Sequence, residues 1–246
     1  MKTVFKSMPI VMLYLLSTVA FAQDVEEEEV LDTSWTGSGE LGFVSTSGNS
    51  ETTTFNLALE FVKTTERWRY RLAGSALGSS EDGTKDAERY QAEVQADRKL
   101  DEKSYIFSIY RYDADKFGAY DPQQSLTAGY GRELMKSEKH VLKGEIGAGY
   151  RRLDERVTDM HSSNVIARFV LDDVWQISGN TSWANRILVE TGKDNTFTQF
   201  NTGLTVAMND KFALKFAFEV RNNSDIPPGD SEHTDTTTTA NIVYNF

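Results

Sequence analysis

Apolar and polar residues alternate along most of the chain from Trp35 to its last residue. At the end, Ala240, Ile242, Tyr244 and Phe246 share one face, and the residues between them share the other. Successive side chains of a β-strand point to opposite sides, so this two-residue period is typical of strands. No segment carries a convincing 3.6-residue period, which excludes a mainly helical chain.

The alternation predicts twelve strands that form one antiparallel, up-and-down barrel of the all-β class. They are expected at about 35–46, 51–63, 67–79, 87–100, 104–116, 123–135, 140–153, 160–171, 175–190, 196–208, 212–222 and 235–246. Most exceed the 9–11 or so residues that a tilted strand needs to cross a bilayer.

The predicted connections alternate between short and long. Those after even-numbered strands are tight, at 64–66, 101–103, 136–139, 172–174 and 209–211. Those after odd-numbered strands are mostly longer, the clearest being 80–86, 117–122 and 223–234. Short turns on one side and long loops on the other are typical of outer-membrane barrels, with both termini on the periplasmic side.

Aromatic residues near the predicted strand ends suggest a membrane girdle. Trp175 and Trp183 fall on one face of the predicted ninth strand, which places them roughly 26 Å apart along it. With a tilt of about 40° this spans much of the apolar band of about 25 Å. The other girdle candidates lie near the short-turn ends: Trp68, Tyr105, Phe212, Tyr244 and Phe246. The alternative is a soluble β-sandwich whose aromatic residues form its core.

The final strand, which ends on an aromatic residue, resembles that of bacterial outer-membrane barrels. That resemblance implies contact with membrane lipid and lipopolysaccharide, and recognition of Phe246 by the assembly machinery. Residues 1–22 are expected to be a secretory signal, with Lys2 and Lys6 before a short apolar core and a small-x-small pattern at residues 20–22. Residues 23–33 are expected to be an acidic flexible tail, and 34–246 the barrel.

Charge and cysteine content narrow the function classes. The formal net charge is −11 and there is no cysteine. Disulfides, thiolate metal sites and cysteine nucleophiles are therefore excluded. Nucleic acid is a poor partner for an acidic protein, because that affinity comes largely from neutralising phosphates.

The mature start carries a recognisable sequence, Trp35-Thr36-Gly37-Ser38-Gly39-Glu40-Leu41-Gly42-Phe43, followed by a Gly48-Asn49 turn. Together with the segments 111–113 and 129–131, it resembles the YdiY-like family of salt-induced outer-membrane proteins, an uncharacterised family built on a domain of unknown function. The resemblance implies a porin-like barrel in the Gram-negative outer membrane. It implies no catalytic residues.

The faces opposite the apolar stripes are expected to line the lumen, with charges of both signs. The candidates are Glu60, Arg67, Arg69, Arg71, Glu93, Asp97, Lys143, Glu145, Arg168, Lys215, Glu219 and Arg221. Turn lengths predict that Glu60 opposes Arg69, Asn201 opposes Glu219, and Thr205 opposes Lys215. Two interpretations stay open: an interior braced by opposite charges, and a narrow polar conduit that selects solutes.

Acidic residues concentrate in the predicted outer loops and account for essentially all of the net charge. They suggest loosely bound Mg²⁺ or Ca²⁺, or a preference for cations at the mouth. A merely solvated loop surface is the alternative.

Catalysis has one remote pair of candidates, His161 and Ser163, which share a lipid-facing side near the outer rim. The His161-Ser162-Ser163-Asn164 run resembles lipid A deacylase barrels, in which such residues serve as base and nucleophile. The carboxylate expected on the following strand falls near Trp175, so the triad is incomplete.

The sequence therefore predicts a non-enzymatic barrel. Its expected function is a narrow passive pore for small solutes or ions with a cation bias. A non-conducting, envelope-stabilising barrel that responds to salt stress is the alternative, and a lipid A-modifying esterase is a remote one.

Overall fold

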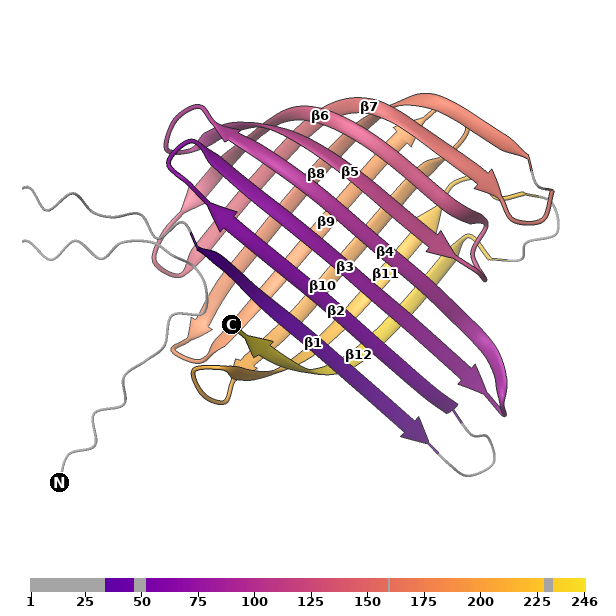
Figure 1. Cartoon of the computed structure of the whole chain (residues 1–246), viewed down its shortest axis with the longest axis horizontal. Helices are drawn as coiled ribbons and strands as arrows, with labels where there is room; N and C mark the ends of the chain where they lie inside the picture. Colours follow the sequence, from indigo (N-terminus) through magenta and orange to yellow (C-terminus); the bar gives the residue numbers. More distant parts are fainter. Residues whose placement is uncertain (1–33, 47–51, 159, 228–231) are drawn as a thin grey trace, which may run out of the picture.

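A computed structural model describes residues 34–46, 52–158, 160–227 and 232–246. Each strand pairs antiparallel with the next in the chain, and β12 returns to β1, so twelve strands form the predicted closed barrel (Figure 1). The expected signal and acidic tail lie outside the described residues. The strands are β1 (Trp35–Thr46), β2 (Thr52–Thr64), β3 (Trp68–Glu81), β4 (Thr84–Lys99), β5 (Ser104–Asp115), β6 (Tyr120–Lys136), β7 (His140–Glu155), β8 (His161–Ser178), β9 (Thr181–Gly192), β10 (Thr196–Ala207), β11 (Phe212–Asn223) and β12 (Thr234–Asn245).

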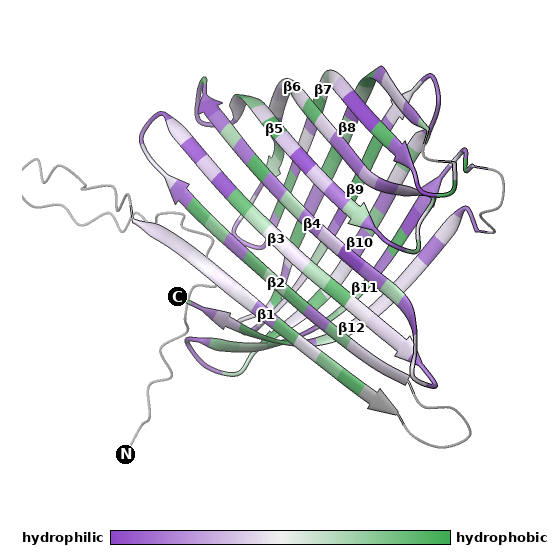
Figure 2. Ribbon diagram, turned by 45° about the vertical axis from the view of Figure 1, so that its right-hand side comes forward, coloured by the Kyte–Doolittle hydropathy of each residue, from purple (hydrophilic) through white to green (hydrophobic). Residues whose placement is uncertain are grey.

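The two-residue period decides which side of the wall each residue faces. Large apolar side chains such as Phe55, Leu57 and Leu59 are exposed on the outside, and the residues between them face the lumen. Figure 2 shows the resulting alternation of hydrophobic and hydrophilic positions along the strands. Because most exposed large apolar groups lie on this outer face, it suits lipid and does not suit the surface of a soluble sandwich. Across the described residues, no helix is long and apolar enough to cross a membrane.

The connections separate the two ends of the barrel. Residues 65–67, 100–103, 137–139, 179–180 and 208–211 turn the chain at the end where β1 begins and β12 finishes. The other described connecting residues, including 116–119, 156–158, 224–227 and 232–233, lie at the opposite end. We refer to these as the short-turn end and the loop end.

The predicted turn at residues 172–174 is wrong, because β8 continues to Ser178 and turns at Gly179–Asn180. The adjacent acids suggest a turn, but both have partners on the strand walls: Asp172 accepts from Arg186, and Asp173 contacts His140. Trp175 and Trp183 therefore lie on different strands and face each other across the β8–β9 pair. The two residues therefore do not mark the two edges of the apolar band along one strand.

Two further connections differ from expectation. The predicted 80–86 loop is a two-residue hairpin turn, in which Asp82 and Gly83 have φ of 48° and 77°. This is the positive-φ pattern that Asp-Gly turns favour between twisted strands. In the β2–β3 pair, Arg69 opposes Thr64 and not Glu60, because the turn uses residues 65–67.

The registers predicted for β10 and β11 are confirmed. Asn201 opposes Glu219 and Thr205 opposes Lys215.

Candidate functional site

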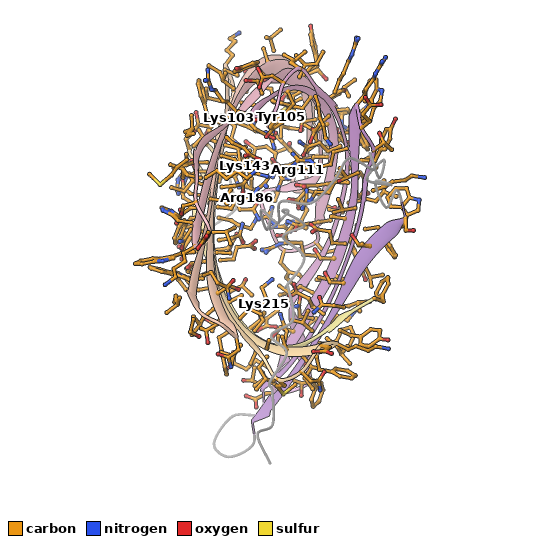
Figure 3. The ribbon with its side chains drawn as sticks, turned by 90° about the vertical axis from the view of Figure 1, so that its left-hand side faces the viewer. Lys103, Tyr105, Arg111, Lys143, Arg186 and Lys215 are labelled. Atoms are coloured by element: carbon orange, nitrogen blue, oxygen red, sulfur yellow. The ribbon has the colours of Figure 1, made fainter. Side chains whose placement is uncertain are left out.

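The interior of the barrel is divided into a filled side and an emptier side. Figure 3 looks along the barrel and shows Tyr105, Lys143, Arg111 and Arg186 crowding one part, with Lys215 beside a more open part. The filled side is lined mainly by β4–β10, and the open side by β1–β4 and β10–β12. We call them the packed half and the open half.

Apolar groups occupy the packed half. Phe107, Ile109, Leu188 and Phe197 all face inward and are buried, and Val170 packs against Leu188 and Phe197. The residues expected to line the lumen were all charged, so these buried apolar side chains are an addition to the predicted lining. The period shows that alternate residues share a face, but it does not show which apolar residues meet inside a flattened barrel.

Ion pairs cross the lumen between walls that are not neighbours in the sheet. Arg221 Nη2 of β11 donates to Asp113 Oδ2 of β5 at 2.7 Å, and Arg111 Nη2 donates to the same oxygen at 2.7 Å. One strand earlier, Arg89 Nη1 of β4 donates to Glu219 Oε1 of β11 at 2.9 Å. Because both partners of each pair are fixed on rigid strands, these bonds hold the two walls together and define one boundary of the open half.

Phe197 lies between two guanidinium groups of this network. The guanidinium carbons of Arg111 and Arg221 are 4.7 Å and 5.2 Å from its ring centroid. Both distances are within the range in which a ring face attracts a cation. Phe197 is fully buried, so it fills the space between the bridges and blocks that part of the lumen.

A second group of bonds centres on Glu145. Its Oε1 accepts from the Tyr105 hydroxyl at 2.9 Å and from Gln95 Nε2 at 3.0 Å. Its Oε2 accepts from Arg168 Nη1 at 2.9 Å. Next to it, Arg69 bonds Asp97 at 2.7 Å through Nε. These charges satisfy one another, which is what a buried charge requires.

The open half contains a cavity of about 120 Å³. Since one water needs roughly 10–15 Å³ by this kind of measure, the space admits several waters or a small solute. Hydroxyl and amide groups dominate its lining: Asn56, Ser75, Gln91, Asn201, Thr237, Thr239 and Asn241, with Glu40, Arg89 and Glu219 among the charged residues. Lys215 Nζ is paired with Glu40 Oε1 at 2.6 Å.

Most residues predicted to line the lumen lie on inward faces, although they divide between the two halves. These are Glu60, Arg69, Arg71, Glu93, Asp97, Lys143, Glu145, Arg168, Lys215, Glu219 and Arg221. Arg67 is a correction, because it lies exposed in the 65–67 turn before β3 begins. Arg71 links two carboxylates, Glu60 at 2.7 Å and Glu93 at 2.8 Å.

Sequence reasoning missed the centre of the network: Arg89, Arg111, Asp113, Arg151 and Glu190, which are all buried. The alternation of charged and aromatic residues between Tyr105 and Asp115 is the signal that could have found part of it.

Aromatic residues gather at the short-turn end of the outer face. Trp68 stacks with Tyr70, and the rings of Phe212, Tyr244 and Phe246 follow one another at 5.1 Å and 5.9 Å. Trp175 and Trp183 are also exposed there. Tyr105 is a correction to the predicted girdle, because it faces the lumen and its hydroxyl bonds Glu145. In β5 the odd-numbered residues, Tyr105 included, face the lumen.

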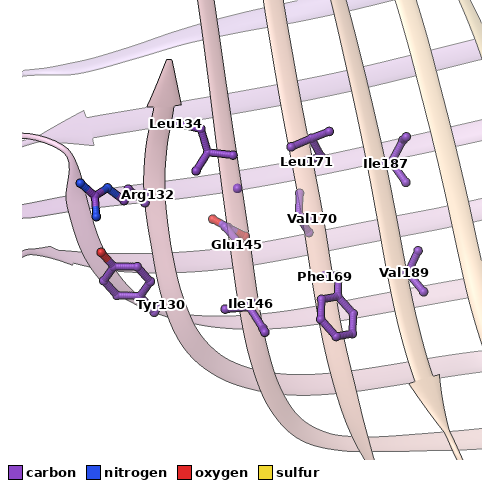
Figure 4. A pocket seen from close by; sticks show the side chains of 11 residues that line it. Tyr130, Arg132, Leu134, Glu145, Ile146, Phe169, Val170, Leu171, Ile187 and Val189 are labelled. Atoms are coloured by element: carbon purple, nitrogen blue, oxygen red, sulfur yellow. The ribbon is translucent and has the colours of Figure 1, made fainter. Parts of the chain in front are cut away.

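The outer wall also carries an apolar groove of about 470 Å³ over β6–β9 (Figure 4). Leu134, Ile146, Phe169 and Leu171 are among the side chains around it, and Gly144 leaves it room. Because the groove opens outward and is almost wholly apolar, we expect acyl chains of membrane lipids to occupy it.

The remote catalytic pair lies where expected, with His161 and Ser163 exposed on the outer face of β8. The expectation that no acid pairs with the histidine is wrong, because Asp154 Oδ1 of β7 is 2.9 Å from His161 Nδ1. The same oxygen accepts from Arg152 Nε at 2.8 Å. Ser163 makes no described bond to His161, so a connected triad is not present among the described contacts.

In the part of the chain that the structure describes, no three His, Cys, Asp or Glu side chains gather around one point. Two carboxylates at the loop end form ion pairs with lysine side chains. Lys116 bonds Asp121 at 2.7 Å, and Lys85 bonds Glu88 at 2.7 Å.

The family model described as "Protein of unknown function, DUF481" matches residues 39–246. A relative in Escherichia coli (strain K12), "Uncharacterized protein YdiY", is 28% identical over 208 residues, which are 83% of this chain and 81% of that protein.

Two solved structures share the fold at low sequence identity. An outer membrane channel from Pseudomonas putida F1 has a TM-score of 0.53 and 13% identity, with coverage of 92% of this chain and 100% of that one. The NanC porin has a TM-score of 0.50 and 9% identity, covering 86% of this chain and 98% of its own. At such identities the likeness concerns the architecture alone, which is that of outer-membrane barrels.

Proposed function

The chain belongs to the family described as "Protein of unknown function, DUF481", and we propose that it is a narrow outer-membrane channel of a Gram-negative bacterium. Small polar solutes or ions pass through the open half of the lumen, and the packed half supports the wall. The observation that carries the proposal is the cavity of about 120 Å³ beside a packed interior.

The lining of the cavity favours small polar molecules. Thr237, Thr239 and Asn241 of β12 offer hydroxyl and amide groups that can replace water around a solute. The nearby charges are paired, as in Lys215 with Glu40, so no strong single-sign field closes the path. Twelve strands lie between the eight-stranded barrels filled by side chains and the wide porins.

The surroundings of the barrel complete the proposal. The acidic excess at the loop end biases entry toward cations, and it is screened by loosely held Mg²⁺ or Ca²⁺ near lipopolysaccharide phosphates. The outward aromatic residue Phe246 at the end of the closing strand is the element that the assembly machinery reads.

A second candidate function has its own observation. The bonds from Arg221 to Asp113 and from Arg89 to Glu219 join opposite walls, as a barrel built for rigidity requires. In this alternative the protein stabilises the envelope under salt stress and conducts nothing.

Single-channel recording of the refolded protein in a planar bilayer with a salt gradient separates the two. A channel gives small discrete steps with a cation-selective reversal potential. A silent bilayer, with folding shown by heat-modifiable gel migration, contradicts the channel and favours the structural barrel.

A matched pair of variants tests whether conduction runs through the cavity of the open half. Ser75→Phe fills the cavity, whereas Ala76→Phe puts the same ring on the outer face of the same strand. The channel proposal expects Ser75→Phe to reduce conductance at least two-fold and Ala76→Phe to leave it unchanged. Equal effects would contradict a path through the open half.

A further inference from the structure

The first and last strands are joined over only part of their length. Backbone bonds between Gly37 and Phe246 start the seam at the short-turn end, with N–O distances of 2.9 Å and 3.0 Å. The pairing continues to Gly42 opposite Asn241 and ends there. β1 nevertheless runs on to Thr46, and β12 begins at Thr234. The described backbone therefore leaves an unpaired stretch on each strand.

The two strands separate toward the loop end. Figures 1 and 2 show β1 and β12 together near the C-terminus and diverging from there. The register would next place Phe43 opposite Ala240 and Val44 opposite Thr239, but neither pair is among the described pairings. We call this unpaired stretch, residues 43–46 of β1 and 237–240 of β12, the seam gap.

The other sides of β1 and β12 are paired. On its other side β12 pairs with β11 along nearly its whole length, from Tyr244 opposite Phe212 to Thr234 opposite Asn222. β1 likewise pairs with β2 up to Thr46 opposite Thr52. Both strands are thus well-formed members of the sheet, and each presents a free edge to the gap.

A free edge within an apolar phase is costly, because its N–H and C=O groups lack partners. Such backbone is tolerated where it borders a water-filled cavity. The seam gap borders the polar cavity of the open half, since Thr237 and Thr239 of β12 line that cavity.

The rim of the gap is polar on one side and apolar on the other. Residues 236–239 are four consecutive threonines, so β12 carries hydroxyl groups on both of its faces. Around it, Phe43 of β1 is 65% exposed and Phe216 of β11 is 57% exposed on the outer face, with Phe55 of β2 beside Phe43. Hydroxyl groups toward the cavity and aromatic rings toward lipid suit a molecule with one polar and one apolar end.

We propose that the seam gap is a lateral opening through which an amphipathic molecule passes between the cavity and the outer leaflet. Its uncharged polar head contacts the threonine hydroxyls and lumen amides, and its apolar tail lies along Phe43, Phe55 and Phe216. This rests on the proposed channel for the cavity that it opens into, and it adds a second exit and a second class of solute.

The absence of cysteine from the chain allows a direct test. A bimane fluorophore on Thr239→Cys reports from the inward face of β12 at the gap. The labelled protein is refolded into vesicles of phosphatidylcholine containing a chain-labelled doxyl lipid, which quenches on contact. Ile242→Cys, on the outer face of β12, is the positive control, and Thr205→Cys, on the inward face between two fully paired strands, is the negative control.

A lateral opening is expected to bring quenching of the Thr239 probe to at least half of that at Ile242, with little at Thr205. Quenching at Thr239 as low as at Thr205 would overturn the proposal, since the wall would then be closed to lipid. Single-channel recording keeps the two ideas apart. Conductance without quenching of the Thr239 probe contradicts only the lateral opening. Quenching of that probe without conductance contradicts only the axial channel.

Cross-linking gives an independent measure of the gap. Leu41→Cys with Ile242→Cys occupies an outward pair in the closed part of the seam, and Phe43→Cys with Ala240→Cys would occupy the next outward pair. The first is expected to oxidise to a disulfide, because its Cα atoms are strand neighbours. The second is expected to form at least ten-fold less disulfide. Equal yields would show that β1 and β12 are paired beyond Gly42 and that there is no seam gap.

Discussion

Arg221 of β11 reaches across the lumen to Asp113 of β5, with Nη2 2.7 Å from Oδ2. Six strand-to-strand steps separate β5 and β11 in either direction around the twelve-stranded barrel, so the two strands form opposite walls. Asp113 is fully buried and Arg221 nearly so, and Arg111 donates to the same carboxylate oxygen. The shared carboxylate makes Asp113 the point at which the lumen is divided.

Removal of this carboxylate is expected to destabilise the barrel strongly. Asp113→Ala leaves the guanidinium groups of Arg111 and Arg221 buried without their shared partner, which costs about 3–5 kcal/mol by analogy with broken buried ion pairs. Heat-modifiable gel migration should show unfolding at a markedly lower temperature. Asp86→Ala, at an exposed position of β4, serves as the control and should leave that temperature nearly unchanged.

Phe197 is expected to act as the plug of the packed half. Phe197→Ala removes a fully buried ring and both of its cation contacts, at a cost of about 3–5 kcal/mol. The same change should widen the lumen and raise single-channel conductance. Phe169→Ala, which removes an outward ring from β8, should alter neither the conductance nor the unfolding temperature to a similar degree. A conductance unchanged in Phe197→Ala would show that the plug is not beside the path.

Close contact between β6 and β7 is expected to require glycine at one inward position. A Cβ on Gly149 would clash with the backbone oxygen of Leu126, and neither backbone can move away easily because both strands are paired in the sheet. Gly149→Ala should therefore lower the yield of folded barrel several-fold in detergent refolding. Gly78→Ala makes the matched control, since a Cβ there would meet nothing within 4 Å. Similar yields for both would contradict the packing of these two strands.

The β8–β9 register predicts a new disulfide. Trp175→Cys with Trp183→Cys places the two thiols on directly opposed residues, which is compatible with a disulfide. Mild oxidation should cross-link them in the folded barrel, and protease cleavage between them would then leave the fragments joined. If both residues lay on one strand, as the sequence pattern suggested, roughly 26 Å would separate them and no intramolecular bond could form.

The sequence by itself determined the architecture, because the information is local. The two-residue period, the alternation of turn and loop lengths, and the aromatic closing strand each need only a few neighbouring residues to be recognised. They were sufficient for twelve strands, an outward apolar face and the β10–β11 register. The predicted β2–β3 register failed because the turn lies later in the chain than assumed, and a displaced turn displaces every pair of the hairpin.

Only the tertiary structure decided how the lumen is divided and where its wall is incomplete. Asp113 and Arg221 are 108 positions apart, and Asn241 bonds Glu40 over 201 positions. No local pattern specifies such contacts, because they depend on how far the barrel flattens and on which inward side chains then meet. The seam gap is of the same kind, since the period of β1 and β12 shows that both are strands but not how far closure of the barrel brings their edges together.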